Sequence, residues 1–461
     1  MIKFSSIKEN NKIRLAFQKL QGEHGKILTV INKKKSLLGV ISTGDLRRAI
    51  LAGYNLNDKI KKIYNRNVTY VYQEELEKKK LNKSNFGSGS LGDSTFYVPV
   101  VNNNKEVKDM IPVERVLGAL ENKSLKQNNN KKKKLPKILI LGGAGFIGTV
   151  LTSKLLEKNY HVTILDQLIY DHKIIKKNFK NKRNLNFILG DVCNLNTQIK
   201  AIKEIDIVVY LAEIVGDSVC GAKPEDALKT NYLSVLSFAH LCSHLAIDKF
   251  IYTSSCSVYG LDKNNKLLNE KSNLNPVSHY ARIKIMSEKA LLSSSNNYFK
   301  PTIVRLGTVF GPSKRMRFDL VVNTMSKFAY FNNKIDVYGG DQWRPNIHVE
   351  DVADGIISII KSKKKNVENQ IFNLSNDKLN LQIIDIAKKV KNTFKNTNLN
   401  VIKTSTDPRN YKVTSKKMKN KTGFVAKKSI ENALKEIKDM FRLKKIKNPD
   451  NKIYNNLLSM K

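Results

Sequence analysis

Residues 137–148 read KILILGGAGFIG, and this stretch decides the fold of most of the chain. The run KILIL is apolar without alternation, as in a strand that a parallel sheet buries on both faces. The glycines that follow, Gly142, Gly145 and Gly148, are spaced GxxGxxG. Glycines at this spacing permit a tight turn and let the backbone approach a pyrophosphate at the N-terminus of the next helix. The stretch therefore predicts a dinucleotide-binding strand, turn and helix.

Two further strands are predicted downstream, and each ends near an aspartate. The run YHVTILD ends at Asp166, 18 residues after Gly148. A carboxylate at this distance can accept hydrogen bonds from ribose hydroxyls and repels a 2′-phosphate, which favours NAD over NADP as the cofactor. The run LNFILGDV places Asp191 where its carboxylate can reach an adenine amino group. A turn at the end of the strand explains Asp191 as well.

Strands and helices continue to alternate beyond these segments. IDIVVYLA and FIYTSSCSVYG read as strands, and DALKTNYLSVLSFAHLCSHLA between them reads as one helix over 226–246. This alternation predicts an α/β fold, a doubly wound parallel sheet.

A catalytic pair is predicted on the helix YARIKIMSEKALL, which carries Tyr280 and Lys284. Residues four apart share one helical face. An ammonium beside a phenol favours the phenolate, so we expect Lys284 to lower the pKa of Tyr280 and make it a usable base. Ser255 lies 25 residues earlier, at a predicted strand end, and can donate a hydrogen bond to the same substrate oxygen.

Composition narrows the class of protein. The 461 residues suit two or three domains, and 41% hydrophobic residues can form a sizeable core. The chain lacks an apolar run of membrane-spanning length, and the start, MIKFSSIKENNK, lacks a secretion signal. The four cysteines form no CxxC pair and have no histidine cluster beside them. We therefore expect a soluble cytoplasmic protein with reduced thiols, no metal site and no membrane partner.

The net charge of +42 raises the question of a nucleic-acid partner. Lysine, however, is spread over the whole chain and accompanies asparagine and isoleucine. This distribution is typical of a compositional bias, so we expect no nucleic acid as a partner and an attraction for small anionic ligands.

The first 122 residues predict a smaller α+β region. KILTVIN and SLLGVIS read as short strands and TGDLRRAILAG as a helix, and a similar order recurs around NVTYVY and TFYVPVV. This duplicated order, and LLGVISTGDLRRAIL above all, resembles a pair of CBS modules over residues 1–122. The resemblance implies that Ser42 and Asp45 contact the ribose of an adenine nucleotide; a folded spacer without a ligand is the alternative. Residues 123–136 show no periodicity and read as a linker.

Residues 137–461 resemble the extended short-chain dehydrogenases/reductases, in particular the NAD-dependent nucleotide-sugar epimerase/dehydratase family that includes UDP-glucose 4-epimerases. GGAGFIG, GDV, YLAE, TSSCSVYG, YARIK, RLGTVFGP, RPNIHVEDVA and DPRNY follow the order of the family's motifs. The resemblance implies a Rossmann core mainly over 137–312, a smaller substrate lobe mainly over 313–461, NAD as cofactor, a nucleotide-sugar substrate and a homodimer.

The resemblance also assigns residues. It implies Ser255, Tyr280 and Lys284 as the catalytic trio. It implies cofactor contacts at Gly142, Gly145, Phe146, Ile147, Gly148, Asp166, Asp191, Val192, Leu211, Ala212, Asn231, Tyr280 and Lys284. It implies substrate contacts at Arg344, Arg409, Asn323 and Thr308. Arginines suit a diphosphate because their planar fork can bond two oxygens. Ion pairs with Asp341 or Asp407 are the alternative for Arg344 and Arg409.

Three positions depart from the family's pattern. Dehydratases carry an Asp-Glu pair where this chain has Cys256 and Ser257. Thr308 stands where relatives often have asparagine, which puts one substrate contact in doubt. Glu213 stands where relatives usually have a small residue, and a carboxylate near the cofactor phosphates is unfavourable unless it points away or pairs with a lysine.

The sequence predicts NAD-dependent epimerisation of a nucleotide-diphosphate sugar through a keto intermediate, with adenine nucleotide as a regulator at the CBS pair. Two alternatives stay open. One is a keto-sugar-nucleotide reductase or dehydrogenase with net hydride transfer. The other is a non-catalytic nucleotide sensor, which has no need for the trio.

Overall fold

The chain forms two compact units, residues 1–134 and 135–461, each described here by itself. The computed structural model describes residues 5–21, 27–42, 45–46, 49–50, 52–66, 68–74, 97–112, 135–171, 173–179, 182–245, 247–296, 299–403, 407–446 and 448–460. Most of the predicted linker, residues 123–134, lies outside this described part.

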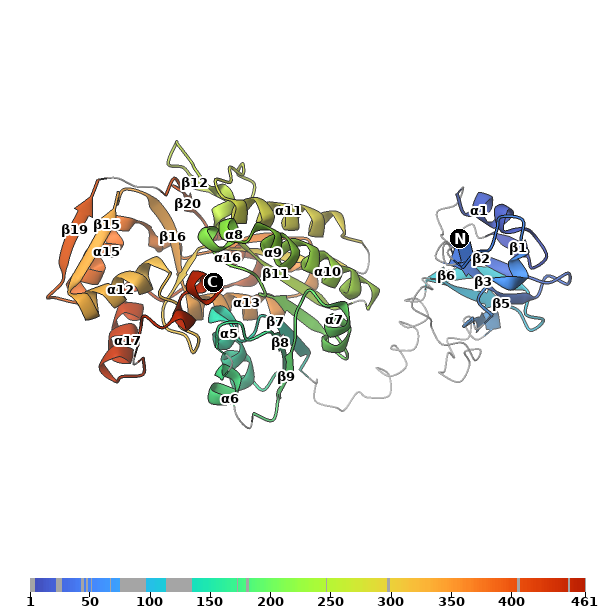
Figure 1. The fold of residues 1–461 in the computed structure, drawn as a ribbon, viewed down its shortest axis with the longest axis horizontal. Coiled ribbons are helices and arrows are strands. Elements are labelled where there is room, and N and C mark those ends of the chain that lie inside the picture. Colours follow the sequence, from blue (N-terminus) through green and yellow to red (C-terminus); the bar gives the residue numbers. More distant parts are fainter. Residues whose placement is uncertain are drawn as a thin grey trace. The chain divides into compact units, whose positions relative to one another are not determined.

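A sheet of seven parallel strands forms the centre of the second unit, in the order β17-β13-β11-β10-β7-β8-β9 (Figure 1). The strands are β7 Lys137–Leu141, β8 His161–Asp166, β9 Leu185–Leu189, β10 Ile207–Tyr210, β11 Lys249–Ser255, β13 Thr302–Leu306 and β17 Ile371–Leu374. The chain starts in the middle, at β7, and winds to one edge before it returns to build the other. The predicted doubly wound parallel sheet is therefore confirmed.

Helices cover both faces of this sheet. They include α5 Phe146–Glu157 and α13 Val349–Lys361 on one face, and α7 Leu195–Ala201, α10 Ser234–His244 and α11 His279–Ser293 on the other. Neighbouring residues of a strand point to opposite faces. Ile138 and Ile140 accordingly pack in the core with α5 and α13, and Leu139 and Leu141 pack in the core with α7, α10 and α11. Two-sided burial explains why KILIL shows no polar alternation.

The segment predicted as one helix over 226–246 is interrupted. It comprises α9 Pro224–Leu228, the π-helical turn η3 Lys229–Leu233, and α10. Single π-helical turns inside helices occur frequently at functional sites. Two other short helices follow strands of the sheet: α8 Asp217–Ala222 comes after β10, and the 3-10 turn η4 Cys256–Tyr259 comes directly after β11.

A smaller lobe follows the sheet in sequence. Its elements are α12 Val321–Asn332, β15 Lys334–Tyr338, α15 Ile383–Thr393, β19 Asn398–Ile402 and α17 Ile430–Arg442, with a separate core that includes Met325, Val337 and Leu434. A separate sheet has three strands, β14 Thr308–Phe310, β16 Trp343–His348 and β18 Asn380–Gln382. These strands alternate in sequence with the elements of the smaller lobe. Within the predicted lobe region, α13 and β17 return to the parallel sheet, because β17 pairs with β13.

The first unit contains a structural repeat. β1 Ser6–Lys8 pairs parallel with β2 Ile27–Ile31, which pairs antiparallel with β3 Leu37–Ser42; β4 Val71–Tyr72, β5 Tyr97–Val101 and β6 Val107–Pro112 repeat this arrangement. The two hairpin turns match, with Lys35 and Lys105 both in the left-handed region and Asn32 and Asn102 each accepting a backbone hydrogen bond. The predicted duplication is thus present, and helix α1 Ile13–Gln21 belongs to the first copy.

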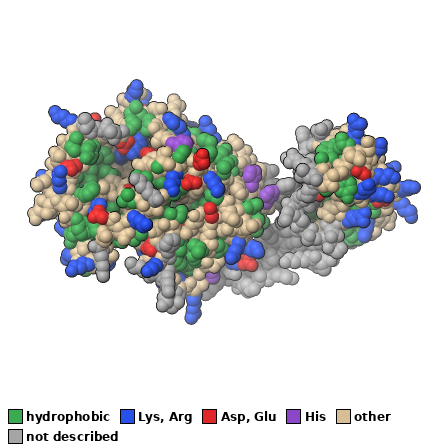
Figure 2. Space-filling model, in the orientation of Figure 1, with side chains coloured by type: hydrophobic (Ala, Val, Ile, Leu, Met, Phe, Trp, Pro, Cys, Tyr) green, Lys and Arg blue, Asp and Glu red, His purple; other side chains and the backbone are tan. Residues whose placement is uncertain are grey.

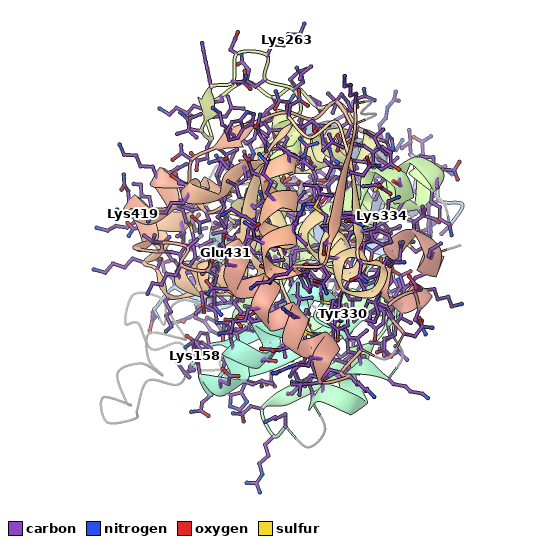
Figure 3. All side chains as sticks on the ribbon, turned by 90° about the vertical axis from the view of Figure 1, so that its left-hand side faces the viewer. Lys158, Lys263, Tyr330, Lys334, Lys419 and Glu431 are labelled. Carbon is purple, nitrogen blue, oxygen red and sulfur yellow. The ribbon has the colours of Figure 1, made fainter. Side chains whose placement is uncertain are left out.

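Basic side chains are dispersed over the second unit. Figure 2 shows blue side chains scattered among other types on the visible face. Lys158, Lys263, Lys334 and Lys419 are exposed and project outward from different parts of the unit (Figure 3). Within the described residues, no helix is both long and apolar enough to cross a bilayer. The four cysteines are unpaired, and Cys220, Cys242 and Cys256 are buried.

Candidate active site

The glycine loop joins β7 to α5 and leaves no room for side chains. Gly142 has a φ of +81°, and a Cβ there would lie 2.7 Å from the backbone nitrogen of Ala212. A Cβ at Gly148 would lie 2.6 Å from the Cα of Gly143. Gly145 is the N-cap of α5 and offers no side-chain acceptor. The first backbone N–H groups of a twelve-residue helix therefore remain available for an anion.

Asp166 ends β8 next to this loop. Its carboxylate accepts hydrogen bonds from the backbone N–H of Ala144 (3.0 Å) and of Leu168 (2.8 Å). Burial raises the pKa of Asp166, although these two hydrogen bonds act to lower it. Asp191 faces the same cavity, and it also closes a turn by accepting from the Cys193 N–H at 2.7 Å. A glycine cradle with a carboxylate at the end of the second strand fits a dinucleotide of the NAD type.

One cavity of about 1100 Å³ runs from the glycine loop to the predicted catalytic residues. Ser255, Tyr280 and Lys284 line it, as does Thr308. Phe146, Ile147, Val192, Leu211 and Ala212, all predicted to contact the cofactor, line it too. A pocket for one drug-sized ligand measures about 300–1,000 Å³. The cavity is therefore large enough to hold a substrate beside a cofactor.

Helix α11 carries the predicted catalytic pair, and buried polar contacts attach it to two strands of the sheet. Glu288, one turn after Lys284, accepts a hydrogen bond from Ser254 at 2.5 Å and pairs with Arg305 at 2.7 Å. All three side chains are buried. This links α11 to β11 and β13, so the face that carries Tyr280 and Lys284 is fixed toward the carboxyl ends of the strands. Ser255, at the end of β11, accepts a hydrogen bond from the Ser257 N–H at 3.1 Å.

The electrostatics of the pair differ from the prediction. The Lys284 ammonium lies 5.6 Å from the centre of the Tyr280 ring, but it forms a buried ion pair with Glu213. Burial raises the pKa of Tyr280 well above its ordinary value, and the Glu213 carboxylate raises it further. The pKa of Tyr280 is therefore raised and not lowered as predicted, because burial and the Glu213 carboxylate outweigh an ammonium that is paired with Glu213.

Arg344 and Arg409 line the cavity, and both are already paired. Arg344 contacts Asp407 at 2.8 Å, and Arg409 contacts Asp407 at 2.7 Å and Asp217 at 2.9 Å. Although burial raises it, the pKa of Asp407 is held well below its usual value by the two arginines. Both arginines thus form the ion pair with Asp407 that the sequence offered as the alternative to a substrate contact, and the pairing of Arg409 with Asp217 was not anticipated.

Two predicted contact residues do not line the cavity. The Asn231 side chain is fully buried and holds the backbone N–H and C=O of Ile214, both at 2.8 Å. The Asn323 side chain is also fully buried, and it bonds the backbone of Gly311 and Arg317. Both amides position loops that line the cavity, because their hydrogen bonds go to the backbone rather than toward the ligand space.

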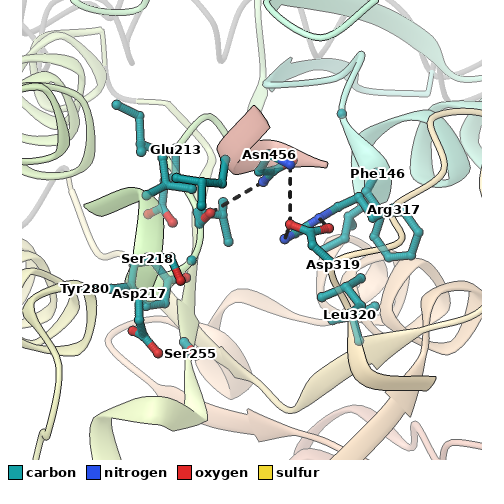
Figure 4. Close-up of a pocket in the computed structure, with 18 of the residues that line it drawn as sticks. Phe146, Glu213, Asp217, Ser218, Ser255, Tyr280, Arg317, Asp319, Leu320 and Asn456 are labelled. Atoms are coloured by element: carbon teal, nitrogen blue, oxygen red, sulfur yellow. Dashed lines mark hydrogen bonds and ion pairs between the residues drawn. The ribbon is translucent and has the colours of Figure 1, made fainter. Parts of the chain in front are cut away.

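The cavity residues that the sequence analysis did not name include Arg315, Arg317, Asp319 and Asn456. The cluster KRMRFD marks the first three in sequence. Asn456, in the C-terminal helix α18 Asn456–Met460, accepts a hydrogen bond from Arg315 at 2.7 Å. Figure 4 shows Asn456 between the wall that carries Tyr280 and Ser255 and the wall that carries Arg317 and Asp319. No local signal connects this last helix to the site.

The described residues contain no group of three or more His, Cys, Asp or Glu side chains placed to hold a metal ion.

In the first unit, Ser42 and Asp45 bond each other, with the Ser42 hydroxyl donating to the carboxylate at 2.7 Å. The Asp45 N–H donates in turn to the Ser42 oxygen at 3.2 Å.

Comparisons with known proteins agree with this geometry. The family model for the NAD dependent epimerase/dehydratase family matches residues 138–375. The UDP-glucose 4-epimerase of Lactobacillus helveticus is 28% identical over 278 residues, which cover 55% of this chain and 81% of that relative. The dTDP-D-glucose 4,6-dehydratase of Dictyostelium discoideum is 28% identical over 282 residues, covering 58% of this chain and 64% of the relative.

A solved structure shares the fold of the second unit. The UDP-glucuronic acid 4-epimerase of Bacillus cereus, in complex with UDP-glucuronic acid and NAD, superposes with a TM-score of 0.60 at 26% identity. The match covers 66% of this chain and 99% of that structure. Since the family model spans just over half of the chain and the glycine loop, Asp166 and the Ser255–Tyr280–Lys284 trio share one cavity, the chain belongs to the NAD dependent epimerase/dehydratase family.

Proposed function

We propose that the second unit is an NAD-dependent epimerase of a nucleotide-diphosphate sugar. One observation carries the proposal: Ser255, Tyr280 and Lys284 line the same cavity as the glycine loop and Asp166. A base and its hydroxyl partner thus face the space that a dinucleotide and a sugar would share. The relatives that act on nucleotide sugars support this substrate class.

Each side chain of the trio has a distinct task in this proposal. Tyr280 removes the proton from a sugar hydroxyl, and Ser255 hydrogen-bonds the oxygen that loses it. Lys284 holds its ammonium beside the phenol, in an ion pair with Glu213. When bound, NAD supplies the oxidising power at the same sugar carbon. The resulting ketone would turn over in the cavity, and return of the hydride to the opposite face of the same carbon would invert it, while Tyr280 returns the proton to the oxygen.

Arg344 and Arg409 hold the diphosphate of the substrate. They share Asp407, and Arg409, which lines the cavity, has 31% of its side chain exposed. A diphosphate offers acceptors for the remaining N–H groups of both forks. The aspartates keep the two guanidinium groups in place before the substrate arrives.

Epimerisation is favoured over dehydration by the residues that follow Ser255. Dehydration needs an acid and a base close to the sugar, and Cys256 and Ser257 provide neither at those positions. Burial raises the pKa of Cys256 strongly, which leaves its thiol protonated at neutral pH. A reductase or dehydrogenase with net redox chemistry is the second candidate, because the same trio serves it.

Product analysis separates these reactions. The purified full chain is incubated with UDP-glucose, UDP-galactose and UDP-glucuronic acid, and the products are analysed by NMR and mass spectrometry. An epimerase yields an isomer of unchanged mass without a net change in nicotinamide absorbance. Loss of water indicates a dehydratase, and accumulation of reduced cofactor indicates a dehydrogenase. Cofactor binding without any conversion of a broader panel of nucleotide sugars supports a sensor and contradicts the proposal.

The first unit is proposed as a CBS pair that binds adenine nucleotide at Ser42 and Asp45 and regulates the enzyme. Its repeated strand order and the Ser42–Asp45 hydrogen bonds support this assignment. Calorimetry of the full chain with AMP, ADP and ATP tests it, with Ser42→Ala/Asp45→Ala as the comparison. If the double variant shows the same heat of nucleotide binding as the wild type, the nucleotide binds at another site. Light scattering of the same sample tests the expected homodimer.

A further inference from the structure

Glu213 is a charged residue at the centre of the cavity. It follows Ala212 at the carboxyl end of β10, directly beside the glycine loop, and its side chain is only 4% exposed. It lines the cavity together with Lys284 and with Tyr280, and Figure 4 labels Glu213 and Tyr280 among the lining residues. A buried carboxylate is costly unless it is paired and hydrogen-bonded, so its contacts need an explanation.

One carboxylate oxygen of Glu213 is used within the protein. Oε2 contacts the Lys284 ammonium, which also donates to the Thr253 carbonyl at 2.5 Å. The Tyr252 hydroxyl lies 3.4 Å from the same nitrogen. Burial raises the pKa of the Glu213 carboxyl, although a hydrogen bond between Tyr252 and the Glu213 side chain acts to lower it. These contacts hold Lys284 in a single position at the base of the cavity.

The other oxygen, Oε1, is buried and has no hydrogen-bond partner among the described residues. Leaving a buried acceptor unsatisfied costs about 1–3 kcal/mol, and more for a charged group. Because this oxygen belongs to a residue of the cavity wall, a ligand with a donor at this place would remove the penalty. Hydroxyl groups donate strongly to carboxylates.

The position of Glu213 identifies the donor. Gly142 and Ala212 are in close backbone contact, so Glu213 lies between the helix end that suits a diphosphate and the Tyr280 phenol. A dinucleotide that spans these two points carries its second ribose between them. We propose that Glu213 is a positioning residue, which holds Lys284 with one carboxylate oxygen and accepts a hydrogen bond from a hydroxyl of this second ribose with the other. The inference rests on the proposed use of NAD.

The pair also controls the charge around Tyr280. Burial raises the pKa of its phenol, and Glu213, Cys220 and Asp217 raise it further, while Arg317 lowers it. Removal of the Glu213 charge removes the carboxylate that, after burial, does most to raise the pKa of Tyr280. The pKa of Tyr280 then falls, and the pH profile of turnover moves to lower pH.

Binding of truncated cofactors tests the ribose contact without turnover. Calorimetry on the full chain compares NAD, ADP-ribose and ADP for the wild type, Glu213→Gln and Glu213→Ala. ADP-ribose carries the second ribose, whereas ADP lacks it. We expect both variants to weaken NAD and ADP-ribose about tenfold or more and to leave ADP unchanged, since a hydrogen bond to a charged group is worth about 1.5–3 kcal/mol. Glu225→Gln, an exposed residue of α9, is the matched control.

The outcomes are distinguishable. Equal weakening of ADP and ADP-ribose indicates a general structural effect and overturns the inference, as does unchanged or tighter binding of ADP-ribose. Weakened binding of UDP-glucose with unchanged ADP-ribose assigns the contact to the substrate and also overturns it. If the wild type binds no NAD, the proposed function itself fails. Circular dichroism verifies folding, and the shift of the pH profile in Glu213→Gln provides a readout that a merely structural role would not move.

Discussion

The chemistry of Tyr280 depends on a third residue as well as on its lysine neighbour. Tyr280 and Lys284 share a helical face, yet the ammonium is paired with Glu213. The phenol is therefore protonated at neutral pH, because burial and nearby carboxylates both oppose the phenolate. Formation of the active base requires either higher pH or a ligand that changes these surroundings.

Removal of the phenol hydroxyl tests the role of Tyr280 directly. In Tyr280→Phe we expect turnover to fall by roughly 100- to 10,000-fold, the usual contribution of a general base, with NAD affinity retained. Steady-state product formation and calorimetry measure the two quantities. Tyr330→Phe is the control, because Tyr330 packs among aromatic rings away from the cavity lining. Full activity in Tyr280→Phe would remove this residue from the mechanism.

The pH dependence of turnover follows from the raised pKa of Tyr280. Only the deprotonated phenol accepts a proton, so turnover should increase with pH through the neutral range, approaching tenfold per pH unit below the pKa. Initial rates at saturating substrate, with circular dichroism at each pH, measure this. A profile that is flat from neutral to alkaline pH would contradict the assignment of Tyr280 as the base.

At the scale of elements, the site lies where the strands of a doubly wound sheet end. Four neighbouring strands, β8, β7, β10 and β11, run parallel, so their carboxyl ends lie on the same side of the sheet. The glycine loop, Asp166, Glu213 and Ser255 all lie at these carboxyl ends. This arrangement was predictable, because each strand has its own apolar run and parallel strands place their carboxyl ends together. The contribution of α18 was not predictable, because a five-residue helix has too little periodicity to indicate its contacts.

Asn456 ties α18 to the cavity wall. Its side chain is 2% exposed and accepts from Arg315, whose Nε already lacks a partner among the described residues. Asn456→Ala leaves a second guanidinium nitrogen unsatisfied, so we expect a loss of about 1–3 kcal/mol in the free energy of unfolding, measured with urea. Leu458→Ala, on the same helix and 46% exposed, should change it little. Equal effects of both substitutions would contradict the role given to the amide.

At the scale of the whole molecule, each hydrophobic core cluster lies within one of the two units, residues 1–134 or 135–461. The clusters that contain Ile140, Tyr210 and Leu434 draw only on the second unit, and those that contain Ile41 and Val101 draw only on the first. Each unit therefore has a core of its own, which is the usual condition for independent folding.

Separate expression tests this independence. Residues 135–461 contain every cavity residue, so we expect this fragment to fold, to bind NAD and to retain the turnover of the full chain in the absence of adenine nucleotide. Thermal unfolding, calorimetry and product formation provide the comparison. An aggregated fragment, or one that loses turnover although it folds, would show that the first unit supports the catalytic one.

The sequence by itself determined the parallel sheet, the glycine cradle, Asp166 and the Ser255–Tyr280–Lys284 trio. These features depend on apolar runs, on glycine spacing and on helical periodicity, which act over a few residues. The tertiary structure alone decided how charges are neutralised. Glu213 meets Lys284 across 71 positions and Asn456 meets Arg315 across 141. The partner of a buried charge depends on which strand and helix ends lie close together in space. A pattern within a few residues of sequence cannot indicate a contact between such distant positions.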